Sequence, residues 1–302
     1  MNPATVSAMV LAAGRGERMR PLTDHCPKPL LRVRGKPLLG WHLHALAAAG
    51  VHHAVVNTAW LGQQIVQEFG NKICRQPNIE EQDTLLNSYH MPLHYSHESQ
   101  DFGGALETLG GICRALPLLQ AGQSSDPVFW LVAGDVFMPD FEFAPAHVAR
   151  FVRSSALAHL WLVPNPAHNP RGDFGLQVRA QGQAALALNL PADDPRPRLT
   201  YATLGLFRAA LFAPPWCDIA PGNPKGVRAP LAPLLRRAMD HGRITAEVYD
   251  GAWTDVGTPE RLAELNANAS RCPAHDAGCG PAPTPLDQAP GAWAAARRTI
   301  PR

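Results

Sequence analysis

Short apolar runs alternate with amphipathic stretches along most of the chain. The runs that predict buried strands lie at residues 6–13, 53–57, 92–96, 128–133 and 159–164. The stretches that predict helices lie at residues 36–49, 60–69, 106–119 and 229–241. Uncharged strands separated by helices are typical of a parallel sheet that is covered on both faces. The pattern therefore predicts an α/β fold, with a Rossmann-like mixed and mostly parallel sheet flanked by helices.

The second half of the chain adds further elements. Residues 176–190 and 199–207 are predicted to pair as strands that cover one side of the site, and residues 247–249 predict another strand. Thr258 is a predicted N-cap, followed by Pro259 at the first helical position and an acidic residue in the first turn. That last helix is predicted to end near residue 269.

One folded domain and a tail account for the whole length. Residues 1–266 are predicted to form the domain. Residues 267–302 are rich in Ala, Pro and Gly and poor in large apolar side chains, so they are predicted to be a disordered tail. Residues 71–91 are polar, irregular and longer than most connections, which predicts a surface insertion without an assigned function.

Composition excludes some classes of protein without choosing one. A chain of 302 residues with 46% hydrophobic content can form a substantial core. The net charge of +2 and the lack of basic runs argue against nucleic acid or an anionic membrane as partner. No apolar stretch approaches the ~20 residues of a membrane-spanning helix. The six cysteines lack zinc spacing and no signal peptide is evident, so reduced thiols in the cytoplasm are expected.

The loop after the first apolar run carries a phosphate-binding pattern. Gly14 and Gly16 allow a tight turn and a close approach of the backbone to a phosphate. Arg15, Arg18 and Lys28 add positive charge, and Lys28 stands between two prolines. The pattern is neither a Walker A loop nor G-x-G-x-x-G. It predicts nucleoside triphosphate chemistry, with an ordinary loop as the alternative for the glycines and a solvated side chain as the alternative for Lys28.

Two aspartates follow apolar, strand-like segments. Asp135 stands in A-G-D-V after the run at 128–133, and Asp255 stands in T-D-V-G-T. A carboxylate at the C-terminal end of a parallel strand lies where open α/β sheets bind ligands. Mg²⁺ is usually bound by one or two carboxylates together with substrate phosphates. The pair therefore predicts a Mg²⁺ site, and a turn or helix cap is the alternative for each aspartate alone.

Six segments together resemble the sugar-1-phosphate nucleotidyltransferases. They are residues 8–38, N-T-A-W-L-G at 57–62, L-E-T at 106–108, G-D-V at 134–136, R-G-D-F at 171–174 and W-T-D-V-G-T at 253–258. The resemblance covers about residues 6–266 and implies the nucleotidyltransferase, GT-A-like, form of the α/β fold. It also implies the reaction, in which an NTP and a sugar 1-phosphate give an NDP-sugar and pyrophosphate. No Ser-His-Asp or Cys-His arrangement suggests a nucleophile, so direct in-line transfer is expected.

The resemblance also implies roles for individual residues. Arg18 and Lys28 would neutralise the phosphates at the reacting centre, and Asp135 and Asp255 would hold a catalytic Mg²⁺. The residues implied to contact the nucleotide are Ala12, Ala13, Gly14, Arg15, Gly16 and Glu107. The residues implied to contact the sugar are Asn57, Trp60 and Asp173.

Some of these positions also admit a purely structural role. The alternative for Glu107 is an acidic residue in the first turn of a helix, and for Trp60 it is a core residue at the start of one. The alternative to a nucleotide contact for Arg15 is a side chain that simply faces solvent. The chain departs from the family at Leu109, where related enzymes often carry the first glycine of E-T-G-G-G, and this departure puts a close backbone contact there in question.

Among the substrates used within the family, the resemblance favours UTP and N-acetylmuramate α-1-phosphate for this chain. It thereby implies a reaction of peptidoglycan recycling. The alternatives with another base or sugar are mannose-1-phosphate guanylyltransferase and glucose-1-phosphate thymidylyltransferase. A regulatory subunit that binds sugar nucleotides without making them is the alternative outside the enzymes. Such a subunit would be free to lose Lys28, Asp135 or Asp255, and this chain keeps all three. The sequence leaves the oligomeric state open.

Overall fold

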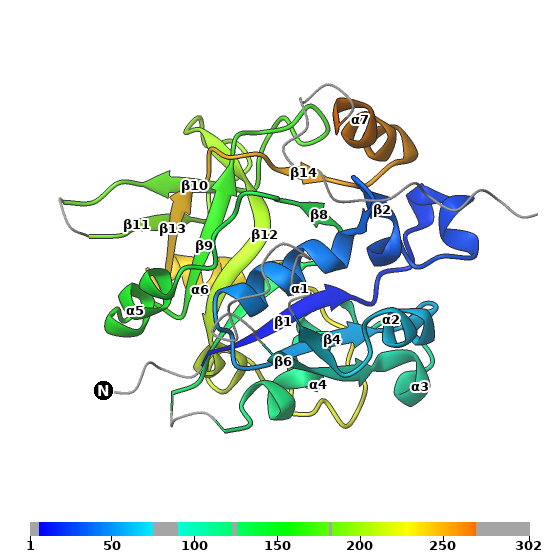
Figure 1. Cartoon of the computed structure of the whole chain (residues 1–302). Coiled ribbons are helices and arrows are strands. Elements are labelled where there is room, and N and C mark those ends of the chain that lie inside the picture. The colour runs from blue at the N-terminus through cyan, green and yellow to red at the C-terminus, as the bar shows by residue number, and fades with distance from the viewer. Residues whose placement is uncertain (1–5, 75–89, 123–125, 181–182, 270–302) are drawn as a thin grey trace, which may run out of the picture.

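The computed structural model describes residues 6–74, 90–122, 126–180 and 183–269, and its centre is a ten-stranded sheet (Figure 1). In sheet order the strands are β10 (Phe174–Gln177), β11 (Ala185–Leu188), β13 (Ile244–Val248), β9 (Ala158–Val163), β12 (Arg198–Arg208), β7 (Val128–Ala133), β1 (Ser7–Ala12), β4 (Ala54–Thr58), β6 (His90–His97) and β5 (Lys72–Cys74).

The sheet is mixed, with a parallel centre. Strands β7, β1, β4 and β6 run parallel to one another, and β9 and β13 form a second parallel pair. Strand β12 lies antiparallel between β7 and β9 and joins the two parallel groups. The predicted α/β fold, a mixed sheet flanked by helices, is confirmed.

Helices cover both faces of the sheet because its strands are apolar on both sides. Val10 of β1 packs in one core cluster with α1 (Leu38–Ala48) and α5 (Pro145–Arg153). Met9, its neighbour in the strand, packs in a second cluster with α4 (Glu107–Leu119) and α6 (Ala232–Asp240). Since successive side chains of a strand point to opposite faces, the two pairs of helices lie on opposite sides of β1 (Figure 1).

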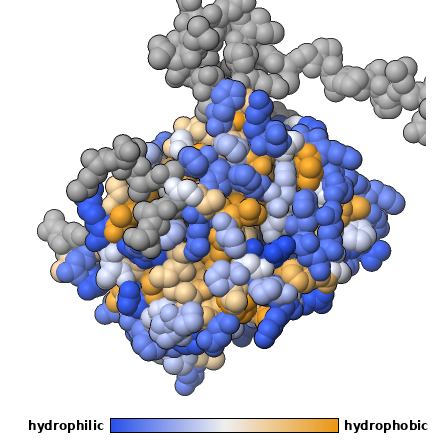
Figure 2. Space-filling model, turned by 90° about the horizontal axis from the view of Figure 1, so that it is seen from below, coloured by the Kyte–Doolittle hydropathy of each residue, from blue (hydrophilic) through white to orange (hydrophobic). Residues whose placement is uncertain are grey.

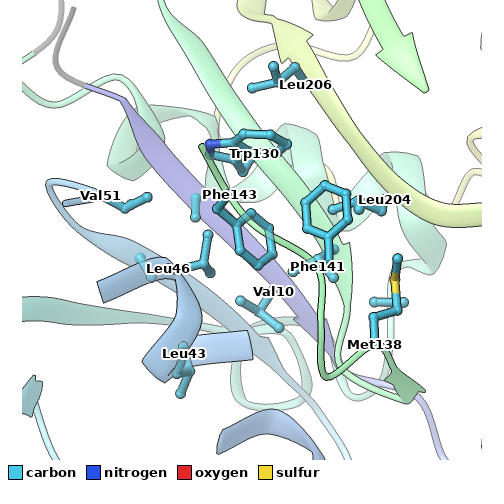
Figure 3. Close-up of a cluster of buried hydrophobic side chains, with 14 of the residues drawn as sticks. Val10, Leu43, Leu46, Val51, Trp130, Met138, Phe141, Phe143, Leu204 and Leu206 are labelled. Atoms are coloured by element: carbon cyan, nitrogen blue, oxygen red, sulfur yellow. The ribbon is translucent and has the colours of Figure 1, made fainter. Parts of the chain in front are cut away.

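Aromatic side chains fill the first of these clusters (Figure 3). Trp130 of β7 is fully buried, and its ring lies edge-on to Phe143 at 5.1 Å and to Phe141 at 6.1 Å between ring centroids. Leu43 and Leu46 of α1 meet the same cluster from the helix side. This packing fixes the position of β7 in the core, and Asp135 follows β7 after Gly134.

Short elements build the region beyond the ends of β1 and β7. They are η1 (Glu17–Met19), η2 (Leu22–Asp24), η3 (Lys28–Leu30), the hairpin of β2 (Arg32–Val33) and β3 (Lys36–Pro37), and the pair of β8 (Val136–Phe137) and β14 (Thr254–Asp255). Helix α7 (Pro259–Ala269) covers this region. Its Asn266 accepts a hydrogen bond from the Arg34 N–H at 2.8 Å and donates one to the Arg32 carbonyl at 3.1 Å, which attaches the helix to the β2–β3 hairpin.

Several elements differ from the sequence prediction or were absent from it. The segment predicted as one strand at 176–190 contains two, β10 and β11, and the strand predicted at 247–249 runs from Ile244 to Val248. The predicted insertion at 71–91 contains β5 and the start of β6, and its residues 75–89 lie outside the described residues. The elements that the pattern did not predict include α3 (Glu98–Phe102), α5, the short helices η1, η2, η3 and η5 (Ala209–Phe212), and the two-residue strands. Helix α2 (Gly62–Phe69) begins two residues later than predicted.

The predicted domain boundary falls inside α7, which continues to Ala269, and residues 270–302 of the predicted tail lie outside the described residues. Within the described part of the chain, no helix is both long and apolar enough to cross a membrane. The face turned to the viewer in Figure 2 carries hydrophilic residues around its outline and hydrophobic residues towards its middle.

Candidate active site

A pocket of about 590 Å³ opens where β1 and β7 end. Its other walls come from the first turn of α4, from α6, and from β10 and β12. Open α/β sheets bind ligands at this position, outside the carboxyl ends of their strands. The residues predicted from the sequence that line it are Ala12, Ala13, Gly14, Lys28, Asn57, Glu107, Asp135 and Asp173. The predicted residues outside its lining are Arg15, Gly16, Arg18, Trp60 and Asp255.

The two glycines of the loop after β1 have different structural requirements. Gly16 has a φ of +69°, and a Cβ there would lie 3.0 Å from Cγ2 of Thr23, so the backbone itself needs glycine. Gly14 has no positive φ, and a Cβ there would meet no atom within 4 Å. Because Gly14 borders the pocket, a side chain at that position would occupy ligand space without disturbing the fold.

Arg15 and Trp60 stack on each other beside this loop. The guanidinium carbon of Arg15 lies 3.7 Å from the centroid of the Trp60 ring. Both side chains donate a hydrogen bond to the carbonyl of Thr23, at 2.9 Å from Arg15 and 3.0 Å from the indole Nε1. The indole therefore supports the loop and does not line the pocket.

Lys28 reaches the pocket from beneath the loop. The flanking prolines hold it at the start of η3, and only 8% of the residue is exposed. Its Nζ donates to Oδ2 of Asp135 at 2.6 Å, so a cation and a carboxylate meet where β7 ends. Arg18 lies on η1 as an exposed residue and is free of hydrogen bonds and ion pairs to the other described residues.

The pairing of β8 with β14 brings Asp255 next to Asp135. Asp255 lies opposite Val136 in this antiparallel pair, and the Val256 N–H donates to the Asp135 carbonyl at 3.0 Å. The Asp255 carboxylate accepts a hydrogen bond from Arg261 at 2.9 Å and lies 3.3 Å from Nε2 of His168. Arg261 also donates to the Asp255 carbonyl at 2.8 Å, which fixes the end of β14.

A buried histidine supports the same two-stranded pair from α1. Nε2 of His42 lies 2.8 Å from the Val136 carbonyl, and because a carbonyl only accepts, Nε2 carries the proton. Burial lowers the pKa of His42 to about 4. The neutral ring thus orients the strand that follows Asp135.

The two aspartates fit a Mg²⁺ ion in donor chemistry. Both offer carboxylate oxygens from adjacent backbone positions, and Mg²⁺ needs few protein ligands when substrate phosphates complete its coordination. Within the described ranges, no three or more His, Cys, Asp and Glu side chains form a group that could hold a metal. A site at this place would therefore consist of Asp135, Asp255 and phosphate oxygens.

Asn57 and Glu98 form a hydrogen-bonded network that links the end of β1 to the start of α4. Oδ1 of Asn57 accepts from the Ala12 N–H at 2.8 Å, and its amide donates to Oε1 of Glu98 at 2.7 Å. Oε2 of Glu98 accepts from the Leu106 N–H at 2.7 Å. Glu98 is fully buried, and burial raises its pKa. The sequence analysis overlooked Glu98, although a carboxylate directly after β6 is the same signal that identified Asp135.

Helix α4 approaches this network closely. A Cβ on Gly111 would lie 2.6 Å from Oε1 of Glu98, so only glycine lets the helix come this near. At the position where the family carries another glycine, the Leu109 N–H donates to the Ala229 carbonyl at 2.9 Å, and the side chain lies in the core. Its backbone N–H thus contacts another protein segment.

Two pocket residues hold an unusual backbone conformation. Glu107 has a φ of +59° and Thr203 a φ of +56°, in the left-handed region that side chains rarely adopt. Thr203 lies at the irregularity of β12 between Tyr201 and Gly205. Such strain costs roughly 1–3 kcal/mol and is concentrated at functional sites. Both residues line the pocket, so their strain supports it as the candidate functional site.

The far wall of the pocket carries one predicted residue and two that the sequence analysis overlooked. Oδ2 of Asp173 accepts from the Tyr201 N–H at 2.8 Å. The hydroxyl of Tyr201 is buried without a hydrogen-bond partner among the described residues, and burial raises the pKa of this phenol. Arg236 of α6 lines the same wall. In the sequence, Arg236 is a polar residue of a predicted amphipathic helix, and that position does not indicate that it lines a pocket.

Comparison with known proteins identifies the class of this one. The model of the nucleotidyl transferase family matches residues 7–271. The chain belongs to this family, which confirms the prediction of a sugar-1-phosphate nucleotidyltransferase. Enzymes of the family generally use Mg²⁺.

Curated relatives cover nearly the same length. The chain is 42% identical over 271 residues to N-acetylmuramate alpha-1-phosphate uridylyltransferase of Neisseria meningitidis, covering 87% of this chain and 98% of that one. It is 38% identical over 282 residues to the protein of the same name from Caulobacter vibrioides, covering 89% and 98%. It is also 42% identical over 267 residues to mannose-1-phosphate guanylyltransferase of Mycobacterium tuberculosis, covering 88% of this chain but 65% of the relative.

A solved structure supports the fold. A Bacillus anthracis protein assigned as a glucose-1-phosphate thymidylyltransferase superposes with a TM-score of 0.62, covering 90% of this chain and 98% of that one. The two sequences are 18% identical, so this likeness supports the fold alone.

Proposed function

We propose that the protein transfers a uridylyl group from UTP to N-acetylmuramate α-1-phosphate, giving the UDP-sugar and pyrophosphate. The observation that carries the proposal is the meeting of Lys28 and Asp135, 2.6 Å apart, at the end of β7 in the pocket. The relatives from Neisseria and Caulobacter that match nearly end to end bear the name of this reaction. We therefore also place the protein in peptidoglycan recycling.

In the proposed reaction an oxygen of the sugar phosphate attacks the α-phosphorus of UTP. The new P–O bond forms as the bond to pyrophosphate breaks, and pyrophosphate leaves on the opposite side. Both substrates are anions, so positioning and charge neutralisation are the main tasks of the protein. We assign the neutralisation to Lys28 in the pocket and to Arg18 on the adjacent η1, whose side chain is exposed and has no hydrogen-bond or ion-pair partner among the described residues.

Asp135 and Asp255 would hold Mg²⁺ together with phosphate oxygens. When bound, the ion would neutralise charge on the phosphates. The β8–β14 pairing brings the backbone of Asp255 next to that of Asp135, and His42 and Arg261 fix the strands that carry them.

The other predicted residues that line the pocket are assigned to the nucleotide, to the sugar or to a positioning role. Ala12, Ala13, Gly14 and Glu107 lie around the end of β1 and the start of α4, where we place the nucleotide. Asp173 lies on the opposite wall, where we place the sugar. We assign Asn57 a positioning role, because both ends of its amide bond to protein groups.

A second candidate is mannose-1-phosphate guanylyltransferase. It keeps the same chemistry with another base and sugar, and the Mycobacterium tuberculosis relative of that name supports it at equal identity. Coverage favours the uridylyltransferase, because the chain spans 98% of the Neisseria protein and 65% of the mycobacterial one. Nucleoside triphosphates are cytoplasmic metabolites, so we place either reaction in the cytoplasm.

The test is pyrophosphate release with Mg²⁺ across a matrix of substrates. The nucleotides are UTP, dTTP, GTP, CTP and ATP, and the sugars are N-acetylmuramate, N-acetylglucosamine, glucose and mannose 1-phosphates. Asp135→Asn is measured beside the wild type. Asp140→Asn is the matched control, because Asp140 is an exposed carboxylate just beyond β8 and outside the pocket lining.

We expect release with UTP and N-acetylmuramate 1-phosphate, lost in Asp135→Asn and kept in Asp140→Asn. A preference for GTP and mannose 1-phosphate would replace the proposed substrates with the second candidate. Nucleotide binding without turnover would overturn the proposed enzymatic activity and would favour a regulatory subunit that binds sugar nucleotides without making them.

A further inference from the structure

The pocket is lined by two cations that lie on different elements. Among the described lining residues these are Lys28 and Arg236. Lys28 pairs with Asp135 at the end of β7. Arg236 projects from α6 towards β10, where its guanidinium carbon lies 5.4 Å from the ring centroid of Phe174. Phe174 follows Asp173 directly, so this cation belongs to the wall where the sugar is placed.

Arg236 is positioned but not neutralised. One of its five N–H donors bonds to Oδ1 of Asn189 at 3.1 Å, and the amide of Asn189 is held by Asp240 at 3.0 Å. No carboxylate of the described residues forms an ion pair with Arg236. A planar guanidinium with free donors is the side chain best suited to bind a carboxylate at two points.

N-acetylmuramate differs from N-acetylglucosamine by a lactyl ether on O3 that ends in a carboxylate. A substrate carboxylate on this wall would lie in a pocket lined by the acidic residues Asp173 and Glu107. Two acids without a cation would repel it, because like charges in a partly enclosed site disfavour each other. Arg236 supplies the opposite charge on the same wall.

We propose that Arg236 binds the lactyl carboxylate of N-acetylmuramate 1-phosphate and so selects it over sugar phosphates that lack this group. The inference rests on the proposed function, because it concerns the sugar of that reaction. Arg236 acts on the choice of sugar and leaves the phosphate chemistry at Lys28 unaffected.

The experiment compares Arg236→Gln and Arg236→Lys with Arg237→Gln. Arg237 is the neighbouring arginine on the same helix, is exposed and lies outside the pocket lining, so it controls for the loss of a positive charge on α6. KM and kcat are measured with UTP against N-acetylmuramate 1-phosphate and N-acetylglucosamine 1-phosphate. Thermal melting of each variant reports folding.

In Arg236→Gln we expect the preference for N-acetylmuramate 1-phosphate, as a ratio of kcat/KM values, to fall by about 10- to 100-fold, because a charge-assisted hydrogen bond is lost. The change should lie in KM for N-acetylmuramate 1-phosphate, with KM for UTP and for N-acetylglucosamine 1-phosphate unchanged. Arg236→Lys keeps the charge but loses the two-point geometry. Its preference for N-acetylmuramate 1-phosphate should therefore lie between those of the wild type and Arg236→Gln. Arg237→Gln should match the wild type.

The outcomes separate the two proposals. A wild type that does not use N-acetylmuramate 1-phosphate overturns the proposed function and this inference with it. A wild type that prefers this sugar, with the preference retained in Arg236→Gln, overturns the inference alone. A raised KM for UTP also overturns it, because Arg236 would then contact the nucleotide. If Arg236→Gln does not fold, the same criteria apply to Arg236→Lys.

Discussion

Asn57 donates its side-chain amide to the buried carboxylate of Glu98 at 2.7 Å. Through its other end Asn57 holds the Ala12 N–H, and through its second oxygen Glu98 holds the Leu106 N–H. The loop after β1 and the segment that opens α4 are therefore fixed relative to each other by one buried network. Both segments border the pocket, and Asn57 and Glu98 line it as well, so the shape of the pocket depends on these two side chains.

Replacing Asn57 by Asp should destabilise the protein. The substitution removes the donor to Glu98 and places a second carboxylate beside a buried one, which costs about 1–3 kcal/mol. Urea unfolding at pH 7 measures the loss. Gln63→Glu makes the same change from amide to acid at an exposed position of α2 and should leave stability unchanged. Equal stability of Asn57→Asp and the wild type would show that the network contributes nothing to stability.

The two loop glycines should respond differently to alanine. Gly16→Ala forces a side chain into a left-handed conformation 3.0 Å from Thr23 and should lose about 1–2 kcal/mol of stability. Gly14→Ala should keep the wild-type melting temperature and raise KM for the nucleotide, because its methyl group enters the pocket. Melting curves and steady-state kinetics on both variants test this. A destabilised Gly14→Ala with unchanged KM would contradict the assignment.

Trp60→Phe should leave recognition of the sugar unchanged. The ring that stacks on Arg15 is retained, while the indole donor to the Thr23 carbonyl is lost, at a cost of about 1 kcal/mol of stability. Thermal unfolding and KM for each substrate provide the measurement. A selective rise in KM for the sugar phosphate would instead support the sugar contact that the sequence analysis expected.

Acid should destabilise the protein through His42. In the unfolded chain a histidine binds a proton below pH 6.5, whereas the folded pKa of His42 is about 4. The unfolded state therefore binds more protons between these values. The contribution of His42 is full above pH 6.5 and is lost as the pH falls towards 4, by up to about 3 kcal/mol.

Unfolding free energies between pH 4 and 7.5 measure this slope. His42→Gln should flatten it, and His25→Gln, at an exposed position, should not. Burial also lowers the pKa of His44, His53 and His147, so part of the slope should persist in His42→Gln. An unchanged slope in His42→Gln would mean that this ring is not the group that titrates.

Local patterns account for what could be predicted. The run at 128–133 is β7 as expected, because continuous apolar residues in a short segment encode a strand buried on both faces. Gly14 and Asp135 were found because they lie next to such elements, and Lys28 because it stands between two prolines in a segment that resembles the family; all three line the pocket. Strand β8 was not predicted, because two residues carry no periodicity.

By itself, the sequence determined the α/β class, the order of the main strands and helices, the loop that follows β1, and the family. Hydrophobic periodicity and the positions of Gly and Pro encode these features locally. Only the tertiary structure decided that Asp255 lies beside Asp135, that Trp60 stacks on Arg15, and that Arg236 lines the same pocket as Asp173. These contacts depend on the packing of segments far apart in the chain, and no local pattern of residues specifies which side chains will meet.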